Sequence, residues 1–346
     1  MRTLHFLRVL SLLCTMSFTV GSVIAQQQPL HYWQKPDSLL QDQATLVFSQ
    51  AHKMLDKYPP SAAVAEERLL ALYSIDVLLH DTRLDNTKAF LDYIGQRYDN
   101  VTLRLQSEKP VNNEIRVYRM YTHGFVIQSP TVTIGIDLIR GGSADRPFIS
   151  DPLMRRLVER CDILFVSHIH GDHADKSVAQ MFYEHNKLVI APPGLWDNTS
   201  PNIKHLRAKE MITETVRIPA RNANLTVRVF PGHQDEVPNN MYAITTPENK
   251  TVLHTGDQYN KDDMAWLAHV ADKVKVDVLL VHSWMGDLEQ SVEGIRPSLI
   301  ITGHENEMEH SIDHRESFWL TYRRFGNIKI PYVVMAWGEY YSFTNN

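Results

Sequence analysis

The segment "HIHGDH", residues 168–173, directly follows the apolar run "DILFVS" and constrains the fold more than any other stretch of the chain. It places His168, His170, Asp172 and His173 within six residues. A buried strand would hold the start of this loop rigidly, while the loop lets successive side chains converge instead of alternating between faces. Imidazole and carboxylate groups together suit zinc and other first-row divalent ions. The segment therefore predicts a metal-binding loop at the end of a buried strand.

Three later positions repeat the combination of an apolar run, a glycine and a metal-binding side chain. His233 follows "VRVFPG", Asp257 follows "TVLHTG" and His304 follows "SLIITG". Glycine permits the tight turn and close backbone approach that such a loop needs. One loop cannot readily fill two coordination shells, so these later residues are predicted to complete the site. The alternative, ordinary surface or hydrogen-bonding side chains, suits a single histidine better than the whole set.

With these residues the chain resembles the metallo-β-lactamase superfamily, whose opening signature is His-x-His-x-Asp-His. The segment "HIHGDH" matches it completely, and "PGHQDE", "HTGD" and "TGHE" resemble the family's later histidine, bridging aspartate and final histidine, in the same order. The resemblance covers roughly residues 114–340. It implies an α/β fold, an αββα four-layer sandwich of two mixed β-sheets flanked by helices.

The resemblance also implies two metal positions. It assigns His168, His170 and His233 to the first ion, Asp172, His173 and His304 to the second, and Asp257 to a bridge between them. Two divalent ions, zinc ahead of manganese or iron, would lower the pKa of a shared water and hold a bridging hydroxide. Asp172 and Asp257 are the expected catalytic carboxylates, with Asp172 orienting that hydroxide.

The spacing of apolar residues changes near residue 108, from a helical pattern to β-forming runs. Residues 26–108 are predicted to be a helical extension, with one helix in "SAAVAEERLLALYSIDVLLH" behind a Ser61 cap and another in "DNTKAFLDYIGQRYDN". We expect this extension to pack on the catalytic domain, in preference to forming a separate functional module. Residues 109–346 alternate β-forming runs with amphipathic segments and are predicted to form the catalytic domain. Helices are expected there in "DPLMRRLVERC", "KSVAQMFYEH", "DDMAWLAHVADKV" and "HRESFWLTYRRF".

Other polar residues near the expected site carry two interpretations each. Asp137, at the end of "TVTIGID", would accept a hydrogen bond from a metal-bound imidazole or would simply cap a turn. His254 and His282 would act in proton transfer or would be satisfied core histidines. His310 and His314 are expected to remain solvated.

Loops around the strand ends are expected to select the substrate. Trp196, Trp284, Met285 and the segment 239–241 ("NNM") combine apolar surface with polar groups. The alternative for each is packing in the core or between elements.

The first 25 residues are predicted to be a signal peptide. Arg2 and Arg8 supply positive charge, an apolar run follows, and "VIA" offers a cleavage site before Gln26. A retained membrane anchor is the alternative, although the run is short and contains Ser, Thr and Gly. We therefore expect a secreted or periplasmic protein without a stable membrane span after cleavage. Cys161, the one cysteine left, is expected to be a small buried hydrophobe.

Charge and chemistry narrow the function. A formal net charge of −5 offers no excess of basic side chains for phosphates, so a nucleic-acid partner is not expected and a small-molecule substrate is. The prediction is an exported metal-dependent hydrolase that cleaves an ester, lactone, phosphodiester or related bond. The alternatives are an exported metal-binding or interaction protein on an inactive hydrolase fold, and a true β-lactamase. The sequence carries no signal for an oligomeric state.

Overall fold

The computed structural model describes residues 35–196, 199–207 and 209–344. The predicted signal peptide lies outside these residues. Contacts within the chain separate a unit ending at Leu40 from a unit of Gln41–Asn346, and the following description concerns the second unit. None of the helices described is both long and apolar enough to cross a lipid bilayer.

The first of two large sheets is mixed. Its strands are, in spatial order, β16 (Tyr340–Thr344), β1 (Glu114–Arg119), β2 (Phe125–Gln128), β3 (Thr133–Ile136), β6 (Ile163–Phe165), β7 (Leu188–Ala191) and β8 (Ile203–His205). The pairs from β16 to β3 are antiparallel, and those from β3 to β8 are parallel. A separate small hairpin joins β4 (Gly142–Ser143) and β5 (Arg146–Pro147).

The second sheet is mixed in the same way. Its strands are, in spatial order, β15 (Tyr332–Val333), β14 (Leu299–Gly303), β13 (Val278–His282), β12 (Thr251–His254), β11 (Val237–Thr245), β10 (Ala223–Gln234) and β9 (Ile212–Ile218). Strands β12 to β15 are parallel, and β9 to β12 are antiparallel. The inner strands β13 and β14 are buried throughout, as their continuous apolar runs require, whereas the edge strand β9 alternates between buried or half-buried and exposed residues.

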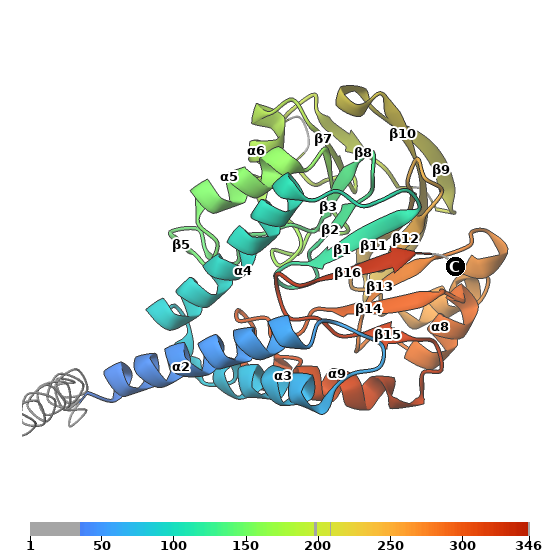
Figure 1. Ribbon diagram of the computed structural model, residues 1–346. Helices are drawn as coiled ribbons and strands as arrows, with labels where there is room; N and C mark the ends of the chain where they lie inside the picture. Colours follow the sequence, from blue (N-terminus) through green and yellow to red (C-terminus); the bar gives the residue numbers. More distant parts are fainter. Residues whose placement is uncertain (1–34, 197–198, 208, 345–346) are drawn as a thin grey trace, which may run out of the picture. The chain divides into compact units, whose positions relative to one another are not determined.

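Helices cover the outer faces of both sheets. They are α2 (Pro36–Lys57), α3 (Glu66–Leu79), α4 (Lys88–Ser107), α5 (Asp151–Arg160), α6 (Lys176–Glu184), α7 (Met264–Leu267), α8 (Leu288–Ile295) and α9 (Phe318–Arg324). In Figure 1, α4, α5 and α6 lie beside the first sheet and α8 lies beside the second. Short 3-10 turns link them at 82–84, 219–221, 261–263, 270–272, 312–314 and 325–327.

Three apolar clusters separate the layers. One joins α2 to α6 with the outer face of the first sheet, through residues such as Phe90, Leu157 and Leu164. A second fills the space between the sheets, and a third lies between the second sheet and the helices α7 and α8. Four layers with three interfaces make an αββα sandwich, which confirms the predicted fold class.

The helices preceding residue 108 are built into this core. Arg68 on α3 is 1% exposed and makes a bidentate pair with Glu339, at 2.6 and 2.8 Å, beside the last strand. The phenol ring of Tyr93 on α4 stacks on Phe48 of α2. The Arg68–Glu339 pair therefore ties the helical extension to the sandwich, and the Tyr93–Phe48 stack joins two helices of the extension to each other.

Several predicted element boundaries differ from the structure. The helix expected behind Ser61 begins at Glu66, and Ser61 instead accepts a hydrogen bond from the backbone N–H of Ala63 in a local turn. The single helix expected in "DDMAWLAHVADKV" is divided into a 3-10 turn, α7 and another 3-10 turn. Cys161 is fully buried in the first apolar cluster, as expected.

Candidate metal centre

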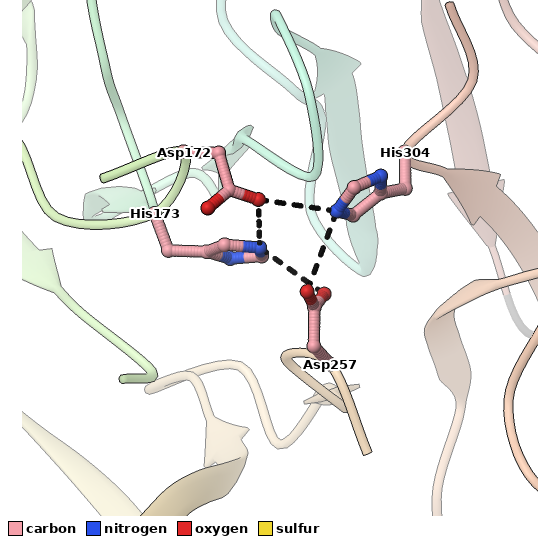
Figure 2. A group of neighbouring side chains, drawn as sticks. All are labelled: Asp172, His173, Asp257 and His304. Atoms are coloured by element: carbon pink, nitrogen blue, oxygen red, sulfur yellow. Dashed lines mark ion pairs between the residues drawn. The ribbon is translucent and has the colours of Figure 1, made fainter. Parts of the chain in front are cut away.

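Four ligand-type side chains meet at the carboxyl ends of parallel strands. Asp172, His173, Asp257 and His304 place one side-chain N or O atom each within 4.8 Å of the others. Figure 2 shows that they point toward one common region from three separate loops, which follow β6, β12 and β14. His173 Nε2 lies 3.1 Å from both Asp172 Oδ2 and Asp257 Oδ1, and His304 Nε2 lies 3.4 Å from Oδ2 of the same two carboxylates.

Left-handed backbone at the strand ends sets these side chains. Gly256, just before Asp257, has φ +52°, and a Cβ there would overlap the side-chain oxygen of Asn239. That oxygen accepts a hydrogen bond from the Asp257 backbone N–H at 3.3 Å. His304 itself has φ +75°, a strained conformation for a residue with a side chain. Its backbone N–H donates to the carbonyl of Thr122 at 3.0 Å, which anchors the strained residue.

The electrostatics of the cluster favour a cation. Burial alone would raise the pKa of Asp257, but the neighbouring His173 and His304 lower it by more, so this pKa lies well below its usual range. The pKa of Asp172 is also well below its usual range, because His173 and His304 lower it in the same way. Burial lowers the pKa of both histidines, yet the carboxylates raise it well above its usual range. The buried carboxylate of Asp257 and the half-buried carboxylate of Asp172 therefore favour positive charge between them.

The hydrogen bonding points the same way. Nε2 of His173, Nε2 of His304 and Oδ1 of Asp257 are buried and have no hydrogen-bond partner among the described residues. Buried polar atoms are nearly always satisfied, so a converging set of unsatisfied ones requires an explanation. Atoms that approach at 3.1–3.4 Å without hydrogen-bond geometry are what common ligands of one ion would show. These residues fit a divalent metal ion of the zinc, manganese or iron class.

Asp137 holds His173 from behind. Its Oδ2 accepts a hydrogen bond from His173 Nδ1 at 2.8 Å, and its two oxygens accept further bonds from the N–H and hydroxyl of Ser167. This is the imidazole contact that the sequence suggested. A carboxylate on Nδ1 fixes the ring and leaves Nε2 for a metal.

His168 and His170 flank the cluster. His168 is fully buried, with its ring 4.2 Å from that of His173 and its Nε2 3.9 Å from Asp257 Oδ2. His170 is half-buried, and its ring lies 4.7 Å from that of His168. His168 is thus in reach of Asp257, and His170 lines the same cavity as Asp257, so both are near enough to be considered as ligands of a second ion.

His233 is placed apart from the other predicted ligands. Its Nδ1 lies 3.1 Å from Asp263 Oδ2 and its Nε2 lies 3.0 Å from a guanidinium nitrogen of Arg207. Of the seven predicted ligands, the structure thus gathers four, sets two beside them and directs His233 to other partners.

Comparison with known proteins gives matches among solved structures. Neither the scan against protein-family models nor the search of curated proteins found a match. Igni18, a metallo hydrolase from the archaeon Ignicoccus hospitalis, is 16% identical, with a TM-score of 0.50 over 67% of this chain and 100% of its own. An isothiocyanate hydrolase from Delia radicum gut bacteria is 15% identical, with a TM-score of 0.50 over 66% of this chain and 100% of its own. A possible metal-dependent hydrolase from Veillonella parvula is 14% identical, with a TM-score of 0.50 over 68% and 100%.

The chain has the metallo-β-lactamase fold. At these identities the likeness concerns the fold, and the site has to be judged on its own residues.

In this metallo-β-lactamase fold the remaining histidines near the centre have different roles. His254 accepts a hydrogen bond from the Gly256 N–H on Nδ1 and approaches the carbonyl of His123 at 3.0 Å with Nε2. Both ring nitrogens contact backbone groups, so the structure supports the interpretation of His254 as a core histidine with satisfied hydrogen bonds. His282 is fully buried, packs on Trp284 with ring centroids 3.7 Å apart, and has no hydrogen-bond partner among the described residues.

Sequence reasoning missed two residues beside the centre. His123 is fully buried, with Nδ1 3.8 Å from Asp257 Oδ1. Glu307 is 2% exposed, lies 3.5 Å from His304 Nδ1, and has a pKa raised to about 8, chiefly by burial. The only available signal for Glu307 was its position three residues after His304. For His123 the signal was a histidine-glycine pair that reads as an ordinary turn.

A cavity of about 450 Å³ opens onto the centre. Asp172 and Asp257 lie on its wall together with Trp284, His310 and His314. The expectation that both of these later histidines are merely solvated is therefore incomplete, because they also line this cavity. Trp284 lines the cavity, which agrees with the interpretation that it contacts substrate.

The other proposed substrate contacts pack in the structure. Trp196 is half-buried against the first apolar cluster, and Met285 and Met241 belong to the third. Asn239 and Asn240 are fully buried, and their side-chain amides donate to the carbonyls of Thr255 and Leu206. For these residues the packing alternative holds.

Proposed function

We propose that this chain is an exported metal-dependent hydrolase that cleaves an ester, lactone, phosphodiester or related bond of a small molecule. The observation that carries the proposal is the convergence of Asp172, His173, Asp257 and His304 beside a cavity whose wall includes the two carboxylates. A divalent ion bound there would polarise the scissile bond and lower the pKa of a water for the attack. The cavity volume of about 450 Å³ suits a small molecule.

The side chains around the proposed metal have different roles. Asp172 is the more accessible carboxylate, with 18% of its side chain exposed against 2% for Asp257, so it is placed to hold and orient a water facing the cavity. Asp257 lies deeper, between His304 and His168, and its Oδ2 is 3.4 Å from the former and 3.9 Å from the latter. This position supports a bridging role between two metal ions. Asp137 holds the imidazole of His173 from behind, and the carboxyl group of Glu307 lies 3.5 Å from His304 Nδ1.

The test uses the purified full chain, freed of metal by chelation and then reloaded with zinc, manganese or iron. Aryl esters, lactones, phosphodiesters and a chromogenic β-lactam are assayed in parallel, so that the β-lactamase alternative is covered. We expect metal-dependent turnover of one class, and a loss of about a hundredfold or more in Asp257→Asn, because the variant removes a negative charge between the metal positions.

Asp272→Asn is the matched control, since Asp272 is 55% exposed and pairs with His269 and Arg296 outside the centre. Its turnover should equal that of the wild type. Metal uptake without turnover of any substrate would favour the alternative of a metal-binding protein on an inactive fold, and absence of metal uptake would remove the proposal altogether.

A further inference from the structure

His233 and Gln234 point to opposite sides of the sheet because they are successive residues of β10. In the hairpin with β11, His233 pairs with Pro238 and Gln234 pairs with Val237. Successive side chains of a strand alternate between faces. Gln234 lines the cavity at the metal centre, and its side-chain oxygen is buried without a hydrogen-bond partner in the described part of the chain. His233 consequently faces a different cavity, of about 550 Å³.

The ring of His233 has no lone pair left for a metal ion. A guanidinium nitrogen of Arg207 lies 3.0 Å from Nε2, and arginine can only donate, so Nε2 is the acceptor. A neutral imidazole then carries its proton on Nδ1, which donates to Asp263 at 3.1 Å. This tautomer satisfies all three groups at once. Metal binding through Nε2 would require the guanidinium to leave.

Both partners of His233 are themselves held in place. Arg207 donates to the side-chain oxygen of Asn240 at 3.2 Å and to the carbonyl of Gly232 at 3.3 Å. Asp263 is 5% exposed and accepts hydrogen bonds from Gln258 at 2.8 Å and from the indole of Trp266 at 2.9 Å. Turning His233 toward the centre would break contacts inside this network, not just expose a free side chain.

We propose that the two metal positions are unequal because two features keep His233 from the centre: the register of β10 turns it to the other face of the sheet, and its hydrogen bond with Arg207 holds it there. The proposal rests on the metal-dependent function above. One ion binds at the four-ligand position of Asp172, His173, Asp257 and His304. The ligands left for the other position are His168, His170 and Asp257, the last of which is common to both positions. Its ion would have one ligand fewer than the family resemblance implies, so it binds more weakly.

The experiment measures zinc affinity and stoichiometry of the metal-free full chain, by titration against a chromophoric chelator and by elemental analysis after buffer exchange. The wild type should retain one ion per chain, with a second ion bound at least about tenfold more weakly, since even loss of a supporting contact typically costs 10–100-fold in metal affinity. Arg207→Met should strengthen the second ion at least about tenfold. Arg207→Met combined with His233→Ala should return it to the wild-type value.

Two further variants keep the result interpretable. Lys209→Met removes the same charge from the same cavity without touching His233 and should leave both affinities unchanged. His233→Ala with Arg207 intact should also leave both unchanged, and it tests the proposal even if Arg207→Met does not fold. Two ions of equal affinity in the wild type, or a weaker second ion in His233→Ala alone, would overturn the inference. Binding of no ion at all would instead reject the proposed metal-dependent function.

Discussion

Asp137→Asn should weaken metal binding at His173 while leaving the size of the side chain unchanged. Asp137 Oδ2 accepts from His173 Nδ1 at 2.8 Å and from the Ser167 hydroxyl at 2.6 Å, while Oδ1 accepts from the Ser167 N–H at 2.7 Å. Asparagine has one acceptor oxygen and one amide NH₂ in these places. In either orientation the NH₂ faces another donor, either the imidazole N–H or the backbone N–H.

In the orientation that turns the NH₂ toward His173, the imidazole has no acceptor once a metal is bound; in the other orientation the Ser167 N–H loses its acceptor instead. A ligand bond through Nε2 requires the proton on Nδ1, which must then find an acceptor. We expect metal affinity to fall about 10–100-fold, or about 1.4–2.7 kcal/mol, the usual cost of losing such a supporting contact. The unsatisfied donor should also lower the free energy of unfolding of the metal-free protein by about 1–3 kcal/mol. Chelator competition measures the first quantity and urea unfolding the second.

Asp162→Asn is the matched control, because Asp162 stands just before β6 whereas the metal-binding loop follows it. Its oxygens accept from the Thr133 N–H at 2.8 Å and from Arg221 at 2.9 Å. This variant should lose stability by the same mechanism yet keep the metal affinity of the wild type. If Asp137→Asn bound zinc within about twofold of the wild type, the supporting role of Asp137 would be refuted.

Three other outcomes are expected. Arg68→Met leaves the carboxylate of Glu339 buried without its ionic partner and should cost about 3–5 kcal/mol in urea unfolding, with a smaller loss when Glu339→Met is added; an equal or larger loss in the double variant would contradict this. Burial raises the pKa of Cys161 to about 12, so at pH 8 iodoacetamide should label Cys161 only after denaturation, and rapid labelling of Cys161 in native protein, distinguished from Cys14 by peptide mass spectrometry, would show the site to be open. Mass spectrometry of protein from its native host should find an amino terminus near Gln26, whereas a retained Met1 would argue against cleavage.

Much of the sandwich could be predicted from local sequence pattern. The continuous apolar runs at 278–282 and 299–303 became buried parallel strands, because both faces of an inner strand are covered. The apolar spacing in 151–160 became α5, with Leu153, Leu157 and their neighbours buried. In each case one short segment contains the whole signal.

Elements that depend on distant partners could not be predicted in this way. The expected helix across 262–274 is interrupted, and Asp263 at its start is hydrogen-bonded to His233 of β10 and to Gln258 of the loop that follows β12. Helix α8 includes Gly294, a poor helix former, where a Cβ would overlap the backbone of Leu267. The glycine lowers the local helical signal, yet it allows the close packing of α7 on α8.

The candidate site shows the same difference between residues placed by local sequence pattern and residues placed by distant partners. Asp257 and His304 follow the ends of parallel strands, where a strand, a glycine and a ligand in sequence suffice to place a side chain at the edge of the sheet. His233 has the same local pattern, but β10 continues through it to Gln234 before the chain turns back into β11. The length of the strand then decides which of two neighbouring residues faces the metal.

That length is set by pairing across the hairpin and not by the ligand motif itself. Because Gln234 still pairs with Val237, the turn is confined to Asp235 and Glu236, and Asp235 adopts the left-handed conformation with φ +47°. If the pairing ended one residue earlier, His233 would belong to the loop, where its side chain would no longer be fixed to one face. The assignment of His233 as a ligand therefore depends on the register of one hairpin, and a variant that loosens the hairpin should act on the second metal position in the same direction as removal of Arg207.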